Sequence, residues 1–458
     1  MSDTTRRNFL TNAAIGAGIA AAPRPQAAAQ NSSNDRINLA VVGIHGRGRT
    51  HIENFGKIRG VRIAYLCDID ERLFPGTVAD IETKHGYKPK THHDLRKVLE
   101  DPDVDAISVA TPDHWHALHT IWACQAGKDV YVEKPCSYTL VEGRRMVEAA
   151  RKYDRIVQVG LNRRSAPKTR AAMELVRSGQ FGEVYRTKTA IYKGRASIGR
   201  EKESSIPQGV HWDLFLGPAK YRAFSPSRFH YGWHFFWDTS TTDIGNTGVH
   251  SLDVLRWGAS KRVHPVKIHS FGGVYVWDSD QETPNVQNAG FEYADGTIME
   301  VELTNLYSPP FDGGRGSVDV LYTSEGYVSS AGGWKATRGE FIPRVKTSDV
   351  GVDETMGNMS FPTREYSDGP QIVAPNGDRG EHFVNFIEAV RSRKREHLHC
   401  EIEEGHLSTS LAHLANISYR TGRKLTFDPA TETFPGDDEA NGYLTREYRE
   451  PYTLPDLG

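Results

Sequence analysis

The 458-residue chain is poor in cysteine, in net charge and in long apolar runs, and each shortage excludes a class of protein. Its four cysteines, Cys67, Cys124, Cys136 and Cys400, lack the density of a disulfide scaffold and the spacing of a zinc site, so we expect buried free thiols. Lysine plus arginine (56) nearly balance aspartate plus glutamate (58), which argues against nucleic-acid binding. A mean hydropathy of -0.54 and the shortness of every apolar run argue against a membrane span in the mature protein.

The N-terminal residues 1–35 form a segment of their own. The stretch "TTRRNFL" places Arg6 and Arg7 before the charge-free run "FLTNAAIGAGIAAAP", which is too short and too rich in glycine and alanine to span a bilayer. Small residues at Ala27 to Ala29 follow, in the order of a twin-arginine export signal and its cleavage site. We therefore predict export to the periplasm through the twin-arginine translocation machinery, with a disordered basic tail as the alternative.

The next part of the chain alternates short apolar runs with stretches whose apolar residues recur every three or four positions. At 458 residues the chain exceeds the usual size of one hydrophobic core, which favours two domains. For residues 36–161 the alternation predicts a Rossmann domain, a doubly wound parallel sheet with helices on both faces. The expected strands are "INLAVVG", "VRIAYLCD", "VDAISVAT", "KDVYVEK" and "RIVQVG", and the expected helices are "RTHIENFGKI", "ERLFPGTVADIETKHG", "HWHALHTIWACQAG" and "LVEGRRMVEAARKYD".

Beyond about residue 162 the pattern changes to longer, more alternating strands. The segments "ADGT" and "SEGY" look like hairpin turns, so residues 162–430 predict an α+β domain with a large, mostly antiparallel open sheet. Residues 194–242 form a long loop region rich in proline, glycine and aromatics, and loops of this length are more often functional than idle. We expect residues 431–458 to form a coil tail.

A glycine-rich turn joins the first expected strand to the first expected helix. The string "AVVGIHGRGRTHIENF" contains Gly43, Gly46 and Gly48, with Arg47 between the last two. Such turns present backbone amides and a helix N-terminus to a pyrophosphate. In the alignment to G-x-G-x-x-G, His45 stands where a middle glycine lets the backbone approach phosphate closely, which is a departure from the motif.

An aspartate at the end of the second strand predicts which dinucleotide binds. Asp68 lies 20 residues after Gly48, where a carboxylate accepts hydrogen bonds from the adenosine ribose and would repel a 2'-phosphate. We therefore expect NAD rather than NADP. The alternative is that Asp68 caps a helix, although Asp70 is the better candidate for that cap.

The fifth strand ends unusually, in "VYVEKP". Here the string "ATPDHWHALHTIWACQAGKDVYVEKP" resembles the Gfo/Idh/MocA family, the glucose-fructose oxidoreductase and inositol dehydrogenase group, whose members show T-P-x-x-x-H followed by G-K-x-V-x-x-E-K-P. With "VGLNRRSAP" and "GNTGVHSLDVLRW", the resemblance extends from Ile37 to about Asp428. It implies a Rossmann domain, an open-sheet domain, a bound nicotinamide dinucleotide and usually a sugar or polyol substrate.

The resemblance also implies roles for single residues. The family's E-K-P lysine falls on Lys134, which would lie beside the nicotinamide and the reacting carbinol and stabilise oxyanion character there. Glu133 would orient this lysine or contact the cofactor. The remaining matches are the segment that passes under the dinucleotide, Thr111, Pro112 and His116, and the crossing point between the domains, Asn162 and Arg163, of which Arg163 would also meet substrate.

A second group of polar residues lies in "DIGNTGVHSLDVLRW". Asn246, His250, Asp253 and Trp257 recur at helical spacing, and His250 is the best base for a substrate hydroxyl. Because Asn246 binds a hydroxyl but cannot take its proton, proton transfer should depend on His250, with Asp243 or Lys134 as a helper. The alternative is that His250 is a buried structural histidine.

The long loop carries aromatic candidates for sugar contact. Its strings "VHWDLFLGP" and "SRFHYGWHFFWD" supply rings for sugar C–H groups and polar edges for hydroxyls, although aromatics in loops also pack for structure alone. The His230–His234 and His114–His116 pairs lack a third ligand at a set spacing, so we expect no metal site. The predicted substrate-binding residues are Lys134, Arg163, Tyr192, Trp212, His230, Trp233, Asn246 and His250.

Three functions are compatible with this sequence. The first is an exported oxidoreductase that moves hydride between NAD and a secondary hydroxyl of a sugar, glycoside or polyol. The second is an NAD-dependent glycosidase that works by transient oxidation and elimination, and the third is a non-catalytic sugar-binding protein. Because the twin-arginine route carries folded proteins, we expect NAD to be tightly bound. The family resemblance also implies a homo-oligomer.

Overall fold

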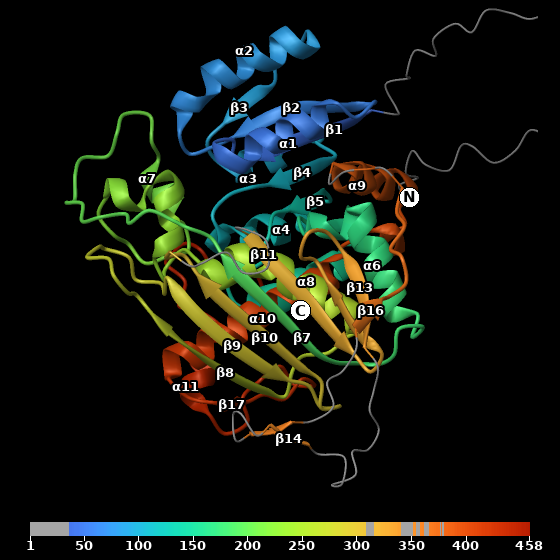
Figure 1. The fold of residues 1–458 in the computed structure, drawn as a ribbon. Coiled ribbons are helices and arrows are strands. Elements are labelled where there is room, and N and C mark those ends of the chain that lie inside the picture. The colour runs from blue at the N-terminus through green and yellow to red at the C-terminus, as the bar shows by residue number, and fades with distance from the viewer. Residues whose placement is uncertain are drawn as a thin grey trace, which may run out of the picture. The chain divides into compact units, whose positions relative to one another are not determined.

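Two β-sheets, with helices between them, organise residues 37–458 in a computed structural model of the chain (Figure 1). The structure describes residues 36–307, 316–339, 366–375, 377 and 380–458, and the backbone alone of 351–353 and 358–360. The predicted export signal lies outside these residues. Among the residues that the structure does describe, every helix is too short or too polar to cross a bilayer.

The first sheet has six parallel strands in the order β3-β2-β1-β4-β5-β6. Its central strands are almost wholly buried, because helices cover both faces, and this explains their near-continuous apolar sequences. The doubly wound parallel sheet predicted from the sequence is confirmed. The strands are β1 (Ile37–Val42), β2 (Val61–Cys67), β3 (Lys90–His92), β4 (Ala106–Val109), β5 (Asp129–Val132) and β6 (Val157–Val159).

The helices of this part begin where the sequence supplies starting signals. Pro75 stands in the first turn of α2, and Thr139 and Glu142 form a capping box at the start of α5, so that side chains satisfy amides that the helix leaves unpaired. Asp70 caps the short turn before α2, as predicted. The helices are α1 (Gly46–Gly56), α2 (Phe74–His85), α3 (Leu95–Leu99), α4 (His116–Gln125) and α5 (Leu140–Lys152).

The second sheet has nine strands in the order β16-β13-β12-β11-β7-β10-β9-β8-β17. Only the β7–β10 pair is parallel among the described pairs of this sheet, so the predicted mostly antiparallel sheet is confirmed. The two predicted hairpin turns join β9 to β10 and β11 to β12. The strands are β7 (Val184–Tyr192), β8 (Lys267–Gly273), β9 (Val286–Glu292), β10 (Ile298–Thr304), β11 (Gly316–Thr323), β12 (Gly326–Ser329), β13 (Lys335–Gly339), β16 (Tyr366–Asp368) and β17 (Leu425–Thr426), with a separate hairpin of β14 (Gly351–Asp353) and β15 (Asn358–Ser360).

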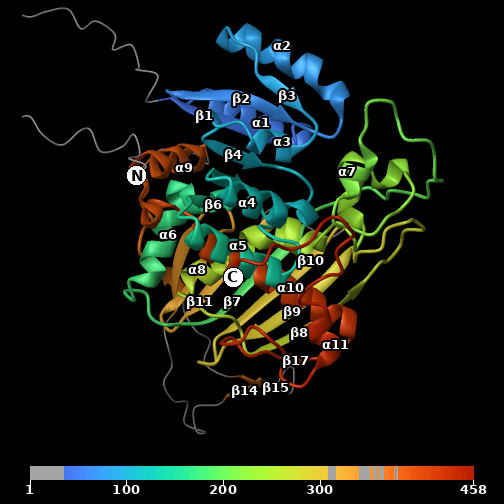
Figure 2. The same ribbon diagram turned by 180° about the vertical axis from the view of Figure 1, so that it is seen from behind.

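The later helices connect the two sheets. Helix α10 contacts α5 and α8 as well as β8, and Figure 2 shows this helical layer from behind. A π-helical turn, Ile244–Gly248, runs directly into α8. The helices are α6 (Pro167–Arg177), α7 (Trp212–Leu216), α8 (Val249–Gly258), α9 (Glu381–Ser392), α10 (Ile402–Thr421) and α11 (Asp438–Gly442).

In two places, residues late in the chain pack against the first sheet and its helices. Helix α9 lies in the segment assigned to the second domain, yet Phe383 and Phe386 pack with Phe55 and Tyr131 of the first sheet and its helices. The predicted coil tail contains α11, and its Tyr452 lies buried against the ring of Trp115. The four cysteines are buried and free, as expected.

Candidate active site

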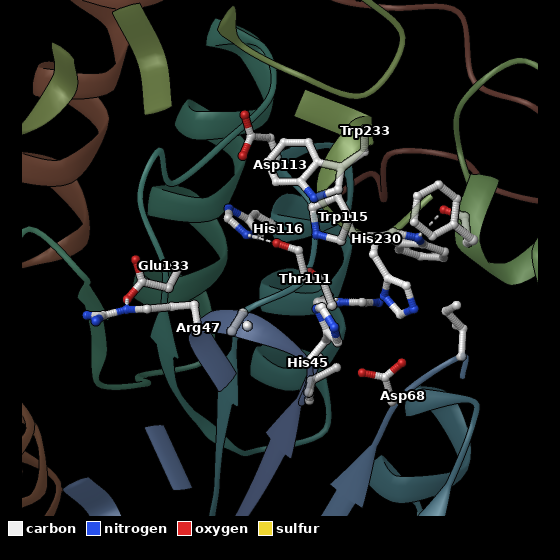
Figure 3. Close-up of a pocket in the computed structure, with 18 of the residues that line it drawn as sticks. His45, Arg47, Asp68, Thr111, Asp113, Trp115, His116, Glu133, His230 and Trp233 are labelled. Carbon is white, nitrogen blue, oxygen red and sulfur yellow. Dashed lines mark hydrogen bonds and ion pairs between the residues drawn. The ribbon is translucent and has the colours of Figure 1, made fainter. Parts of the chain in front are cut away.

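A cavity of about 450 Å³ opens at the carboxyl ends of β1, β2, β4 and β5. Parallel strands point their carboxyl ends to one edge of a sheet, and ligands of doubly wound folds bind there, near the point where the strand order reverses. In this sheet the reversal lies between β1 and β4. Residues of the 194–242 loop and of the Ile244–Gly248 turn form the opposite wall (Figure 3).

The glycine turn after β1 has the close packing that such a site needs. Gly43 has a φ of +81°, and a Cβ on it would lie 2.7 Å from the carbonyl oxygen of Ala110. A Cβ on Gly48 would lie 1.8 Å from the carbonyl oxygen of Gly43. Gly46 differs, because a Cβ there would meet nothing within 4 Å and the residue lines the cavity. Glycine at 43 and 48 therefore permits the fold, and Gly46 leaves room beside the helix.

The N-terminus of α1 faces this cavity. The helix begins at Gly46, and its N-cap residue is His45. Among the described residues, no side chain accepts a hydrogen bond from the amides of its first turn as a cap. The first amides of a helix carry partial positive charge and need an acceptor. Together with the glycine packing, this observation fits the pyrophosphate of a dinucleotide.

Asp68 lines the cavity where β2 ends. Its carboxylate accepts hydrogen bonds from the amides of Ile44 (2.7 Å) and Asp70 (2.9 Å), so the side chain is held in place. Burial nevertheless raises the pKa of Asp68 to about 6. A ribose that donates hydroxyl hydrogens to this carboxylate would offset part of that burial cost, which fits NAD.

His45, the residue in place of the middle glycine, meets a histidine of the long loop. Its ring stacks on His230 with 4.1 Å between centroids, and His230 Nε2 lies 3.1 Å from a carboxylate oxygen of Asp70. His230 has a φ of +48°, so the loop backbone is strained at this contact. The histidine pair thus covers the glycine turn from the side of the loop.

A buried ion pair fixes Glu133 at the end of β5. Arg47 Nε donates to Glu133 Oε1 at 2.7 Å, and His51 Nε2 lies 3.0 Å from the same oxygen, an arrangement partly visible in Figure 3. Burial alone would raise the pKa of Glu133, but Arg47, His51 and Lys134 hold it well below its usual value. The structure places Glu133 as a charged anchor beside Lys134.

Lys134 reaches across the cavity to the π-helical turn. Its Nζ donates to the backbone oxygen of Asn246 at 2.8 Å and to the side-chain oxygen at 2.7 Å. Burial lowers the pKa of Lys134, with Glu133 opposing the shift. His250, four residues after Asn246, lines the same cavity. The structure therefore joins Lys134 to Asn246 and places His250 in the lining of the same cavity.

Asp243 does not line this cavity, which corrects its predicted place beside the reacting hydroxyl. Its carboxylate lies 2.6 Å from Arg195 Nη2 and 3.0 Å from His234 Nε2, and it accepts a hydrogen bond from Asn305. Burial would raise the pKa of Asp243, but His234 and Arg195 hold it far below its usual value. The buried charge holds its neighbours in position.

Five other predicted site residues also lie outside the cavity lining. Arg163 pairs with Asp319 at 2.9 Å, and the Tyr192 hydroxyl donates to Glu302 on the neighbouring strand. Trp212 is buried in a loop cluster and stacks on Phe215, which lines the cavity in its place. The five are Gly48, Asn162, Arg163, Tyr192 and Trp212, whereas the lining includes Gly43, His45, Gly46, Arg47, Asp68, Thr111, Pro112, His116, Glu133, Lys134, His230, Trp233, Asn246 and His250.

Sequence reasoning missed several lining residues. Lys193 directly follows Tyr192 and faces the cavity, because successive strand residues point to opposite sides. Burial lowers the pKa of Lys193. Asp113 accepts two hydrogen bonds from Thr241, at 3.0 and 2.7 Å, and so ties the first sheet to the long loop. The position of Lys193 just after a strand could have indicated it, and Asp113 directly follows Pro112 inside the T-P-x-x-x-H segment.

Comparison with known proteins assigns a family to both parts of the chain. Residues 37–161 match the family described as "Oxidoreductase family, NAD-binding Rossmann fold", and residues 185–323 and 364–454 match "Oxidoreductase family, C-terminal alpha/beta domain". A glycosyl hydrolase family 109 protein of Shewanella baltica is 29% identical over 206 residues, which cover 40% of this chain and 45% of that protein. The alignment thus covers less than half the length of the curated relatives.

Solved structures share the fold at low sequence identity. The WlbA dehydrogenase from Bordetella pertussis, solved with NADH and UDP-GlcNAcA, is 17% identical with a TM-score of 0.60, over 86% of this chain and 99% of that one. Levoglucosan dehydrogenase with NADH and levoglucosan is 15% identical with a TM-score of 0.60, over 85% and 99%. Since the family matches cover most of its length, the chain belongs to the Gfo/Idh/MocA oxidoreductase family, with an NAD-binding Rossmann fold.

Proposed function

We propose that this oxidoreductase transfers hydride between NAD and a secondary hydroxyl of a sugar, glycoside or polyol. The observation that carries the proposal is the Lys134 ammonium, which is fixed on Asn246 in the cavity that His250 also lines. A cation and a base at one carbinol match what alcohol oxidation requires, because the hydroxyl loses a proton as the carbon loses hydride.

The chain's own residues then have distinct tasks. Bound NAD would accept the hydride. His250 takes the hydroxyl proton, Lys134 stabilises negative charge on the oxygen, and Asn246 holds both the hydroxyl and the lysine. The amides of α1 and the Asp68 carboxylate hold the dinucleotide. Trp233, which lines the opposite wall, supplies a ring face for the sugar, whereas His230 lies over the glycine turn.

A second candidate is a glycosidase that uses the same cofactor without net redox change. The curated relatives named as glycosyl hydrolase family 109 proteins favour this reading. A panel of sugars and glycosides, followed by nicotinamide absorbance and product mass together, separates the candidates. NADH with an oxidised sugar supports the dehydrogenase, and aglycone release without net NADH supports the glycosidase. Tight sugar binding without either product would support the third possibility, a non-catalytic sugar-binding protein.

The identity of the cofactor has its own test. We propose that NAD is bound tightly and preferred over NADP, since a 2'-phosphate would approach the Asp68 carboxylate. Denaturing the freshly purified protein and measuring the released nucleotide by mass decides between them. Release of NADP would refute the role given to Asp68.

Export and assembly are separate proposals. We propose that the twin arginines direct the chain to the periplasm, so changing both Arg6 and Arg7 to lysine should retain the protein in the cytoplasm on cell fractionation. Equal periplasmic amounts of both forms would contradict this. We also propose a homo-oligomer, which light scattering coupled to size exclusion would detect and a monomer mass would refute.

A further inference from the structure

A second cavity of about 420 Å³ lies apart from the active site and shares no lining residue with it among the described residues. It forms where the start of α5, the end of the long loop, the last turns of α10 and the C-terminal segment meet. The lining residues are Tyr138, Thr139, Lys220, Arg222, Trp237, Asp238, Ser240, Thr241, His413, Asn416, Ile417, Arg420, Tyr443, Thr445, Arg446 and Glu447.

The charges that line this second cavity are unbalanced. Four cationic side chains face two carboxylates, and both carboxylates already have partners. Asp238 pairs with Arg222, and Glu447 lies 3.4 Å from Lys220 at the exposed rim. Arg420 and Arg446 have no carboxylate within ion-pair distance among the described residues. The cavity therefore carries two guanidinium groups whose charge no neighbouring acid neutralises by contact.

Of these two arginines, Arg446 has the larger number of buried, unpaired hydrogen-bond donors. Its Nε and Nη1 are buried, and no described residue accepts a hydrogen bond from them, while Nη2 reaches only the Asp238 carbonyl at 3.5 Å. Burial raises the pKa of the nearby Glu142 and Arg446 opposes that shift, so the two charges attract each other without a hydrogen bond. The Glu142 oxygens already accept from the Tyr138 and Thr139 amides and the Tyr448 hydroxyl. Buried guanidinium nitrogens without acceptors are costly, so this position calls for an anion.

Aromatic rings hold both guanidinium groups in fixed planes. Arg446 lies over Tyr138 at 4.4 Å from the ring centroid, and Arg420 lies over Tyr443 at 4.1 Å and over Trp237 at 4.9 Å. Stacking engages the face of a guanidinium and leaves its N–H edge free. Such an edge matches the geometry of a carboxylate or a phosphate.

We propose that the second cavity binds a small oxyanion, the carboxylate or phosphate group of a sugar-sized ligand, held by Arg446 and Arg420. Ser240 and Thr445 line the same cavity and add hydroxyl groups to it. The volume accommodates a monosaccharide but is at the small end of ligand cavities. The proposal does not depend on which reaction the active site performs.

Calorimetry on the NAD-loaded protein tests this site, because the dinucleotide then fills the other phosphate-binding position. The probes are inorganic phosphate and glucuronate, with glucose as the neutral control, at constant ionic strength. We expect one of the two anions to bind with a stoichiometry of one and glucose to bind far more weakly. Phosphate alone would indicate a phosphorylated ligand, and glucuronate alone an acidic sugar.

Matched arginine variants locate the binding. Arg446→Gln and Arg420→Gln should each weaken the anion about tenfold or more, as expected for lost charge-assisted hydrogen bonds. Arg423→Gln, which removes the same charge from a surface pair with Asp437, should change nothing. Arg420 is exposed, so its variant remains informative if Arg446→Gln fails to fold. Absent binding of both anions up to about 10 mM, or equal affinity in all variants, would overturn the proposal.

Discussion

Replacing Asp68 by asparagine should make the stability of the cofactor-free protein less dependent on pH and should weaken NAD binding. Asp68 is fixed by the Ile44 and Asp70 amides at the end of β2, and burial disfavours its charged form. Asparagine has nearly the same shape and carries no charge, but its Nδ2 cannot accept a hydrogen bond, so one of the two amides loses its acceptor at every pH. The position thus trades stability of the empty fold for recognition of the ribose, a common arrangement at binding sites.

The size of the effect follows from the pKa of Asp68, which rises from 3.8 to about 6 in the folded protein. At about 1.4 kcal/mol per pKa unit, the ionised carboxylate costs the folded apoprotein at most about 3 kcal/mol. Because the folded state binds the proton more tightly, the free energy of unfolding falls as the pH rises through this window. The stability of Asp68→Asn relative to the wild type should therefore rise by up to about 3 kcal/mol between pH 4 and pH 7. The missing hydrogen bond lowers that relative stability by about 1 kcal/mol at every pH.

Urea unfolding of refolded apoprotein at several pH values measures this difference. Asp70→Asn is the matched control two residues away. Burial raises the pKa of Asp70, but the hydrogen bonds and charge of Arg72 lower it by more. The net pKa shift of Asp70 is therefore downward, opposite to that of Asp68. Its ionised form therefore stabilises the fold above the ordinary aspartate pKa, and that contribution is lost as the pH falls. Asp70→Asn should thus destabilise the protein at neutral pH.

NAD titration of the same Asp68→Asn protein completes the test. Loss of the charged acceptor should weaken NAD by about tenfold or more. One result would refute the reasoning: a stability difference between Asp68→Asn and the wild type that does not change between pH 4 and pH 7.5. Unchanged NAD affinity would remove Asp68 from the cofactor site.

Three further variants test the roles of Lys134, His250 and Asp243. Lys134→Met should lower kcat by about 10²–10³-fold, the usual effect of losing a donor at a developing oxyanion, and wild-type turnover in the folded variant would exclude that role. His250→Gln should lower kcat by about 10²–10⁴-fold in steady-state assays, whereas a small effect would indicate a structural histidine. Asp243→Asn should act on stability, because it leaves Arg195 buried without its carboxylate. Urea unfolding should show a loss of about 3–5 kcal/mol at pH 7.5, with a smaller loss below pH 4, and an unchanged midpoint would contradict this.

The sequence predicted the fold well because its signals were local and repeated. Continuous apolar strands indicated a sheet covered on both faces, and turns such as "ADGT" indicated antiparallel pairing. The packing of α9 escaped this reasoning, since its amphipathic pattern predicts a helix with one buried face but does not show which sheet buries that face. The packing of Phe383 on Tyr131 is a long-range contact that no local pattern encodes.

The site was predicted in part for the same reason. Residues tied to a strand end or to a motif, such as Asp68 and Lys134, line the cavity. Tyr192 and Trp212 were chosen by side-chain type alone. Tyr192 is the last residue of β7 and Trp212 the first residue of α7, and side-chain type does not show which way either side chain points. Asp243 is of a residue type that often acts in catalysis. Only its contacts with Arg195 and His234 show that its charge serves the structure here.

The packing of α9 on the first sheet and of Tyr452 on Trp115 beside it has a consequence for biosynthesis. The ribosome releases residues 37–161 long before it makes Phe383, Phe386 or Tyr452, so the nascent nucleotide-binding half has an uncovered apolar face during most of translation. The nucleotide-binding domain should complete its packing only after translation ends. A premature stop before residue 380 should therefore yield a fragment that chaperones or proteases capture.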